Sequence, residues 1–145
     1  MSMRIFFMLL AVYLMGCSPV RTEVKFRKAK IDKVKMNIPQ NYVFEGLQGS
    51  HEFEQRYWYS DSSVIYITNF ENTINYKEIR QQNTYYDRFN ALQSNDTLTL
   101  QGVNIDGLYW KDMLLGGGIT IGYSRVPQYR VKEFEKAISS AKKLR

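Results

Sequence analysis

The sequence predicts an α+β fold with a single antiparallel sheet of about six to seven strands, on which a mid-chain helix and a C-terminal amphipathic helix pack. Several short segments alternate apolar and polar residues, which is the period of a half-buried strand. Two longer segments carry apolar residues at helical spacing instead. Because the connections between the strand segments are short, neighbouring strands are expected to pair antiparallel.

The first group of strands precedes the mid-chain helix. Val34, Met36 and Ile38 alternate with polar neighbours, and the Pro-Gln-Asn turn after them leads into a second strand. Two later segments are rich in β-branched and aromatic residues, and the polar turn "SDSS" between them predicts a hairpin. The expected strands of this group cover residues 33–38, 42–45, 51–59 and 64–70.

The second group of strands follows the mid-chain helix and covers residues 97–105, 108–115 and 119–126. Asp106 and Gly107 join the first two segments, and this dipeptide is a strong signal for a short hairpin. Residues 116–118, three glycines, join the next two. A phosphate-binding loop needs a helix N-terminus after its glycines, whereas a strand follows here, so the glycines predict a hairpin turn or a bulge.

Two segments have helical periodicity. Over residues 76–93, apolar and aromatic side chains recur every three or four positions, and Asn75 could cap this helix through its side-chain oxygen. Pro127 favours a helix start, and a clean apolar stripe follows it up to Leu144, with charged side chains on the other faces. The second helix is therefore expected to run from about residue 127 to residue 144.

The N-terminal segment indicates export. Arg4 is its only charge, and Ile5–Met15 is an uncharged apolar run of 11 residues. A membrane-spanning helix needs about 20 residues, so this run is too short to cross a bilayer. A positive start followed by an apolar run of roughly 7–15 residues is typical of a secretory signal peptide. The alternatives are a buried N-terminal helix or strand, or an uncleaved anchor.

The end of this segment, Leu14, Met15, Gly16 and Cys17, resembles the lipobox of bacterial lipoproteins. That pattern has an aliphatic residue, a tolerant position, a small residue and an obligatory cysteine. Met15 is bulkier than the common choices, and the other three residues match. The resemblance covers residues 1–18 and implies cleavage before Cys17, with a diacylglyceryl thioether on its sulfur and an acylated amino group. Cys17 is then a lipid anchor, not a catalytic thiol or a metal ligand.

The residue after the cysteine bears on location. Ser18 resembles the residue found in lipoproteins that are forwarded to the outer membrane, whereas an aspartate there would resemble retention at the inner membrane. The following segment also lacks the acidic cluster that some bacteria use to direct lipoproteins to the cell surface. We therefore expect a lipid-anchored protein of the bacterial cell envelope, on the periplasmic face of the outer membrane.

These features divide the chain into a signal peptide over 1–16, a lipidated basic tether over 17–33 and one α+β domain over 34–145. Residues 21–35 hold seven basic and two acidic side chains, a net charge of +5, whereas residues 36–145 hold twelve of each. A basic segment beside an anionic leaflet gains about 1 kcal/mol per Lys or Arg, so it is expected to contact the membrane. A solvated linker is the alternative. The neutral domain argues against nucleic-acid binding.

The sequence lacks the marks of a catalytic centre. His51 is the only histidine, and no serine has the surroundings of a nucleophile elbow. One histidine and one lipidated cysteine are too few for a zinc site, and no cofactor is expected. Glu52 and Glu54 would share a strand face about 6.5–7 Å apart, a separation that glycoside hydrolysis can use. Such carboxylates are more often a solvated face, so we expect no enzyme activity.

Aromatic residues are the remaining feature. Tyr85 and Tyr86 lie on the mid-chain helix, and most strand aromatics are expected in the core. Trp58 and Trp110 are the candidate binding residues among the exposed minority. The expected function is a non-enzymatic binding or assembly module for an envelope protein partner. The alternative is a lipoprotein that binds a small molecule or a glycan, with or without hydrolysis at the two glutamates.

Overall fold

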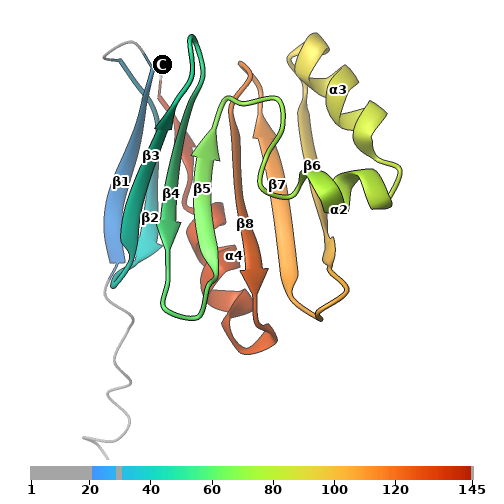
Figure 1. The fold of residues 1–145 in the computed structure, drawn as a ribbon. Coiled ribbons are helices and arrows are strands. Elements are labelled where there is room, and N and C mark those ends of the chain that lie inside the picture. Colours follow the sequence, from blue (N-terminus) through green and yellow to red (C-terminus); the bar gives the residue numbers. More distant parts are fainter. Residues whose placement is uncertain (1–20, 29–30, 145) are drawn as a thin grey trace, which may run out of the picture.

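The computed structural model describes residues 21–28 and 31–144 (Figure 1). Cys17 and the predicted signal peptide lie outside the described residues. A six-stranded antiparallel sheet forms the centre of the molecule, and a three-stranded sheet and short helices pack against it. The mixed α+β fold is therefore confirmed, whereas the single sheet was too simple, because the strands belong to two sheets.

The larger sheet has the strand order β3-β4-β5-β8-β7-β6, and all neighbouring pairs are antiparallel. Each of these strands was expected from the sequence. β3 continues further than expected, to Gln48, because its second half pairs with β4. The strands are β3 (Val43–Gln48), β4 (Phe53–Trp58), β5 (Val64–Thr68), β6 (Thr97–Val103), β7 (Tyr109–Leu115) and β8 (Thr120–Val126).

The expected turns between β6, β7 and β8 are present. Gly107 has a φ of 75°, a left-handed conformation that glycine adopts without strain, and its N–H donates to the Asn104 carbonyl oxygen at 3.0 Å. The Asn104 side chain accepts hydrogen bonds from two further backbone N–H groups of the same turn. The three glycines between β7 and β8 also have positive φ angles, as a tight hairpin connection requires.

The smaller sheet, in the order β1-β2-β9, contains two strands that the sequence analysis did not predict. β1 (Arg21–Lys28) lies within the predicted tether and pairs antiparallel with β2 (Ile31–Pro39). Val24 and Phe26 are buried, so they have the alternation of a half-buried strand. The basic residues between them concealed this pattern. The folded part therefore begins by Arg21, earlier than the expected boundary at residue 34.

The mid-chain segment forms two short helices, not one: α2 (Tyr76–Gln81) and α3 (Tyr85–Ser94). Asn83, between them, has a φ of 59°, and a left-handed residue cannot continue a right-handed helix. Asn75 precedes α2 as expected, but its side chain makes no cap hydrogen bond. That side chain is instead buried, with its amide directed toward β7 and β8.

The C-terminal helix is shorter than the apolar stripe predicted. A short 3₁₀ turn, η1 (Gln128–Arg130), leads into α4 (Val131–Ser139). At its end, the Ser140 hydroxyl accepts a hydrogen bond from the backbone N–H of Asn37, at 2.8 Å. The chain then pairs with β2 as strand β9 (Lys142–Lys143). Backbone pairing with β2 therefore replaces the last helical turn.

Helices α2 and α3 lie on one face of the larger sheet, whereas the smaller sheet and α4 lie on the other. β1, β2 and α4 cover the face that is at the back in Figure 1. The main core lies between these layers and includes Phe26, Met36, Ile38, Ile65, Ile67, Ile121, Tyr123, Phe134 and Ile138. On the front face, α2 and α3 cover β6 and β7, and a second cluster of Ile79, Leu100 and Trp110 is buried there.

One end of the larger sheet gathers segments that are far apart in the sequence, and we call this end the base. β1 begins at the base, because Arg21 pairs with Pro39 at the end of β2. α3 lies toward the opposite end of the molecule (Figure 1). The segments that connect elements at the base are residues 40–42, 59–63, 104–108 and 127–130.

Gly122→Ala is expected to lower the free energy of unfolding by about 1–3 kcal/mol, the usual cost of overpacking a core. A Cβ at Gly122 would lie 2.5 Å from the Tyr66 hydroxyl oxygen and closer still to the Lys111 carbonyl oxygen. Gly46→Ala is the matched control, because its Cβ would meet only the Phe44 ring, at 3.4 Å. Urea denaturation of both variants tests this, and equal stabilities would contradict the packing described for β8.

Candidate functional site

The carboxylates considered for hydrolysis have different surroundings. His51 and Glu52 are exposed just before β4. Glu54 is 3% exposed and forms an ion pair with Arg56, which also contacts Glu45 on β3 at 3.4 Å. The Glu54 carboxylate is therefore neutralised by Arg56, which also links β4 to Glu45 on β3. The two neighbouring glutamates do not form the pair of accessible carboxylates that glycoside hydrolysis uses.

The two tryptophans also differ in their surroundings. Trp110 is 2% exposed and packs against Ile79 and Leu100 beneath α2, which corrects the expectation that it could offer its ring to a partner. Alternation along β7 could not reveal this, because a helix from another segment covers that face. Trp58 is half-buried at the end of β4, and its indole N–H donates to the Glu45 carboxylate at 2.9 Å.

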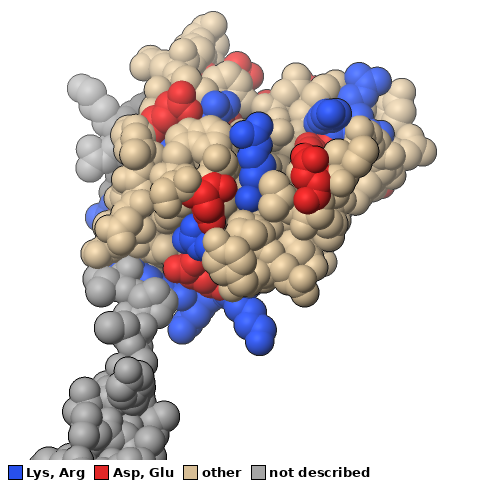
Figure 2. Space-filling view, turned by 60° about the horizontal axis from the view of Figure 1, so that its bottom comes forward, with Lys and Arg blue, Asp and Glu red and all other residues tan. Residues whose placement is uncertain are grey.

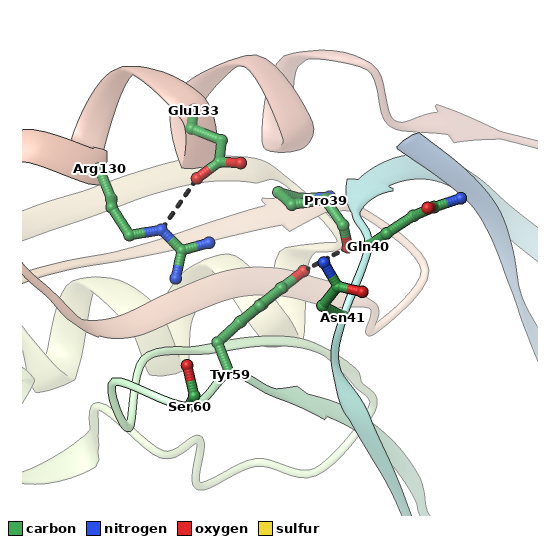
Figure 3. Close-up of a pocket in the computed structure, with 7 residues that line it drawn as sticks. All are labelled: Pro39, Gln40, Asn41, Tyr59, Ser60, Arg130 and Glu133. Atoms are coloured by element: carbon green, nitrogen blue, oxygen red, sulfur yellow. Dashed lines mark hydrogen bonds and ion pairs between the residues drawn. The ribbon is translucent and has the colours of Figure 1, made fainter. Parts of the chain in front are cut away.

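A polar pocket of about 430 Å³ opens at the base (Figure 3). It forms where the turn after β2, the end of β4 and the start of α4 meet. Asn41 has a φ of 63°, a conformation that asparagine tolerates, and this residue turns the chain from β2 toward β3. The residues that line the pocket are Pro39, Gln40, Asn41, Tyr59, Ser60, Arg130 and Glu133.

Arg130 is the central side chain of this pocket. Its guanidinium lies 4.7 Å from the ring centroids of both Tyr59 and Phe134, which is a cation–π geometry. Its Nε donates to the Glu133 carboxylate at 2.9 Å, and its Nη1 donates to Asp61 at 3.0 Å. One side chain therefore joins the β4–β5 turn to the start of α4.

Burial, hydrogen bonds and the Arg130 charge together shift the pKa values of two groups beside Arg130. Burial acts to raise the pKa of Asp61, but hydrogen bonds from Ser63 and Arg130 outweigh it and lower that pKa below its ordinary value. Burial raises the pKa of the Tyr59 hydroxyl well above its ordinary value, although the Arg130 charge opposes the rise. The Tyr59 hydroxyl therefore stays protonated at neutral pH and donates to the Pro39 carbonyl oxygen at 2.9 Å.

Sequence reasoning did not bring the pocket residues together. Asp61 and Arg130 are 69 positions apart, and neither has a local pattern that marks it as a partner of the other. The only signals were the turn residues after β2 and the proline before η1, which predict a change of chain direction and not a site.

A second feature is an exposed group of rings on α2 and α3. The aromatic surface consists of Tyr76, Arg80, Tyr85, Tyr86 and Phe89. The Tyr85 ring centroid lies 5.7 Å from those of Tyr76 and Tyr86 in edge-to-face contacts, and 6.5 Å from that of Phe89. The Arg80 guanidinium lies 5.7 Å from the Tyr76 ring centroid. Tyr86 is 71% exposed and Phe89 is 38% exposed, so both rings are accessible to a partner.

A buried polar network fixes these helices on the sheet. The Asp112 side chain, on β7, is fully buried. Its carboxylate accepts hydrogen bonds from the Tyr66 hydroxyl, from the Thr73 hydroxyl at 2.7 Å and from the Asn75 amide at 2.7 Å. Burial raises the pKa of Asp112 above its ordinary value, and these donors oppose the rise. Since Thr73 and Asn75 lie just before α2, the network determines where that helix begins.

Arg88, on α3, supplies the cation of this network. Its side chain is 2% exposed, and its Nη1 lies 3.8 Å from the Asp112 carboxylate. Its hydrogen bonds go to the Thr120 hydroxyl at 3.3 Å and to the Glu71 carbonyl oxygen at 3.0 Å. Within the described residues, the Asn75 Oδ1 is the buried side-chain polar atom without a hydrogen-bond partner. The Arg88–Asp112 pair therefore attaches α3 to the sheet, and the hydrogen bonds of Thr73 and Asn75 to the same carboxylate attach the start of α2.

Three further findings bear on function. In the part of the chain that the structure describes, no group of His, Cys, Asp or Glu side chains is arranged to hold a metal ion. Across residues 21–28 and 31–144, no helix has the length and apolar character needed to span a membrane. In comparisons with known proteins, no family model, no curated protein and no solved structure matches the chain.

Arg88→Ala is expected to lower the free energy of unfolding by about 3–5 kcal/mol, because it leaves the Asp112 carboxylate buried without its cation. Thermal and urea denaturation followed by circular dichroism measure the loss. Arg80→Ala is the matched control, since it removes the same side chain from an exposed position on α2. The control is expected to have nearly the stability of the unsubstituted protein. Equal losses in the two variants would contradict the role assigned to Arg88.

Proposed function

We propose that the chain is a lipid-anchored protein of the bacterial cell envelope and that its domain is a non-enzymatic binding module for a protein partner. The observation that carries this proposal is the aromatic surface, which lies away from the base (Figure 1). Tyrosine and arginine are enriched at the centres of protein interfaces, where a few such side chains contribute most of the binding energy.

The proposed anchor sits close to the base. Cys17 precedes the first residue of β1 by four positions. Four residues span at most about 14 Å when fully extended, so acyl chains on Cys17 would keep the base near the membrane. Several acyl chains hold a protein firmly at a bilayer, because each buried methylene contributes about 0.8 kcal/mol. The aromatic surface, on the face of the sheet that α2 and α3 cover, would then stay above the membrane, where an envelope protein can reach it.

The aromatic surface suits association because its rings are already held in position. Tyr85 contacts three other rings, and the Asp112–Arg88 network attaches the underlying helices to the sheet. A surface that is ordered before binding loses little conformational entropy when the partner arrives. We expect the Tyr86 and Phe89 side chains to insert into the surface of the partner, because they are the most exposed rings of the group.

The proposed location is the periplasmic face of the outer membrane, on the basis of Ser18 after the lipidated cysteine. The partner is expected to be another envelope protein. Nucleic acid is not a proposed partner, because residues 36–145 carry equal numbers of basic and acidic side chains.

The second candidate function is binding of a small molecule or a glycan. The pocket at the base favours it, because about 430 Å³ lies within the usual size of a ligand site. Its guanidinium, carboxylate and amide groups suit a polar ligand. Hydrolysis at Glu52 and Glu54 gains no support, because Glu54 is buried and paired with Arg56.

Cys17→Ser is expected to abolish lipidation and to leave residues 1–16 attached. Mass spectrometry of the purified chain should find an acylated N-terminus at Cys17 in the unsubstituted protein and an unmodified precursor in the variant. Ser18→Asp is the matched variant, because it keeps the cysteine and changes only the proposed sorting signal. It should carry the lipid and fractionate with the inner membrane. An unsubstituted protein with an intact N-terminus and no lipid would refute the anchor.

The double variant Tyr86→Ser/Phe89→Ser is expected to lose its envelope partner. A tagged copy is crosslinked gently in intact cells, purified in detergent and analysed by mass spectrometry. The unsubstituted protein should recover one envelope protein in a fixed ratio, and the double variant should recover little of it, because both rings are exposed and their removal leaves the core intact.

Tyr129→Ser is the control for that experiment, since it removes an equally exposed tyrosine at the base. It should recover the partner in the same ratio as the unsubstituted protein. Recovery of the lipidated monomer alone from the unsubstituted strain would argue against a protein partner. Partner recovery that survives the double variant but fails in Tyr129→Ser would move the interface to the base.

A further inference from the structure

Exposed large hydrophobic side chains gather at two sites on the described part of the chain. Tyr86 and Phe89 belong to the aromatic surface. The others lie at the base, at the start of β3, the end of β6, the β6–β7 turn and η1. We call them the basal residues: Val43, Phe44, Val103, Ile105 and Tyr129. Ile105 is 96% exposed and Tyr129 is 79% exposed, so neither contributes to the core.

Strand pairing places Val43 and Val103 at the same end of the sheet, on its two opposite edge strands, β3 and β6. Val43 pairs with Trp58 at the end of β4, and Val103 pairs with Tyr109 at the start of β7. Single exposed apolar residues are ordinary, so the basal residues indicate an interaction site only together with the anchor proposed beside them. Figure 2 turns the base toward the viewer and shows charged groups of both signs next to one another among uncharged side chains.

We propose that the base is a membrane-docking surface, on which Ile105 and Tyr129 enter the boundary between the headgroups and acyl chains of a phospholipid bilayer. This inference rests on the proposed anchor at Cys17. Only three residues separate that cysteine from β1, so the base is the part of the domain that the anchor brings to the bilayer. Tyrosine is enriched at membrane interfaces, where its ring is buried and its hydroxyl stays hydrated.

Charge attraction is not what holds the base to the bilayer. The charged side chains at the base nearly balance and leave a net charge of +1: the basic ones are Arg21, Arg125, Arg130 and Lys132, and the acidic ones are Asp61, Asp106 and Glu133. Lysines such as Lys33 and Lys35 lie further along β2, away from the base. Docking through apolar side chains therefore does not require anionic lipid, whereas docking through the basic β1–β2 hairpin would require it.

The pocket at the base gives this surface a polar centre. The Arg130 hydrogen bonds within the described residues are made by its Nε and Nη1, and Glu133 accepts through its Oε2. The Nη2 of Arg130 and the Oε1 of Glu133 take no part in them. The two side chains lie together on one wall of the pocket, facing Tyr59 and the turn after β2 (Figure 3). With the base on a bilayer, the pocket opens to the headgroup layer. The Arg130 guanidinium can then bind a lipid phosphate, and the Glu133 carboxylate can bind a lipid ammonium group.

Single-cysteine labelling of the lipidated full-length protein tests the proposal. In that protein the Cys17 thiol is blocked by its lipid, so a new cysteine is the one reactive thiol. Ile105→Cys, Tyr129→Cys and the control Tyr86→Cys are labelled with a fluorophore and reconstituted into vesicles. The vesicles contain phosphatidylethanolamine and phosphatidylglycerol with brominated acyl chains, which quench a nearby fluorophore. The two basal labels should lose most of their fluorescence, and the control label should keep it.

Vesicle flotation of each sample separates the possible failures. Protein that floats with the vesicles while all three labels stay bright would overturn basal docking and leave the anchor intact. Equal quenching of the Tyr86→Cys label would also overturn it, because the domain would then lie on its side. Protein that does not float would overturn both the anchor and the docking. Quenching that persists in vesicles without phosphatidylglycerol supports apolar docking, and quenching that requires this lipid would assign docking to the basic hairpin instead.

Discussion

The buried Asp112 carboxylate is the constraint on which the arrangement of the helices depends. A carboxylate inside a fold costs several kcal/mol of desolvation unless donors and a cation surround it. The segment before α2 supplies the donors, and α3 supplies Arg88. α2 packs Ile79 against Leu100 and Trp110, whereas α3 buries only Ala91 besides Arg88, so the apolar contribution of α3 is small. The need to surround one charge on β7 therefore positions both helices, and with them the aromatic surface.

Local patterns predicted most of the larger sheet, because strand period, turn residues and β-branched composition all operate over a few residues. Predictions from local patterns were wrong where charged neighbours, a backbone conformation or a contact distant in the sequence determined the structure. In β1, lysines and arginines surround Val24 and Phe26, so a buried strand had the composition of a solvated tether. In the mid-chain helix, a left-handed Asn83 divides a continuous apolar period. At the C-terminus, pairing with β2 takes the last residues from the helix.

The candidate sites were less predictable than the fold. Whether a ring is exposed depends on which other segment covers it, and Trp110 is buried only because α2 lies over β7. The pocket joins three segments through Arg130, whose partners are separated from it by up to 69 positions. Sequence periodicity carries no information at that distance. The sequence assigned Tyr85 and Tyr86 to a helix. Their place in an exposed group follows only once Arg88 and Ala91 are known to form the buried face of α3.

The two groups of exposed apolar side chains, one at the base and one on α2 and α3, give the molecule a defined orientation relative to a membrane at the base. Strands of six or seven residues span roughly 20–23 Å, so a bilayer at the base and a partner on the aromatic surface need not compete for space. The short segment between Cys17 and β1 leaves little freedom to turn the domain over. With an acylated Cys17, the aromatic surface is therefore held at a limited height above the headgroups. A partner that is itself fixed in the same membrane meets that surface at a raised effective concentration, so even a small group of exposed rings can sustain binding.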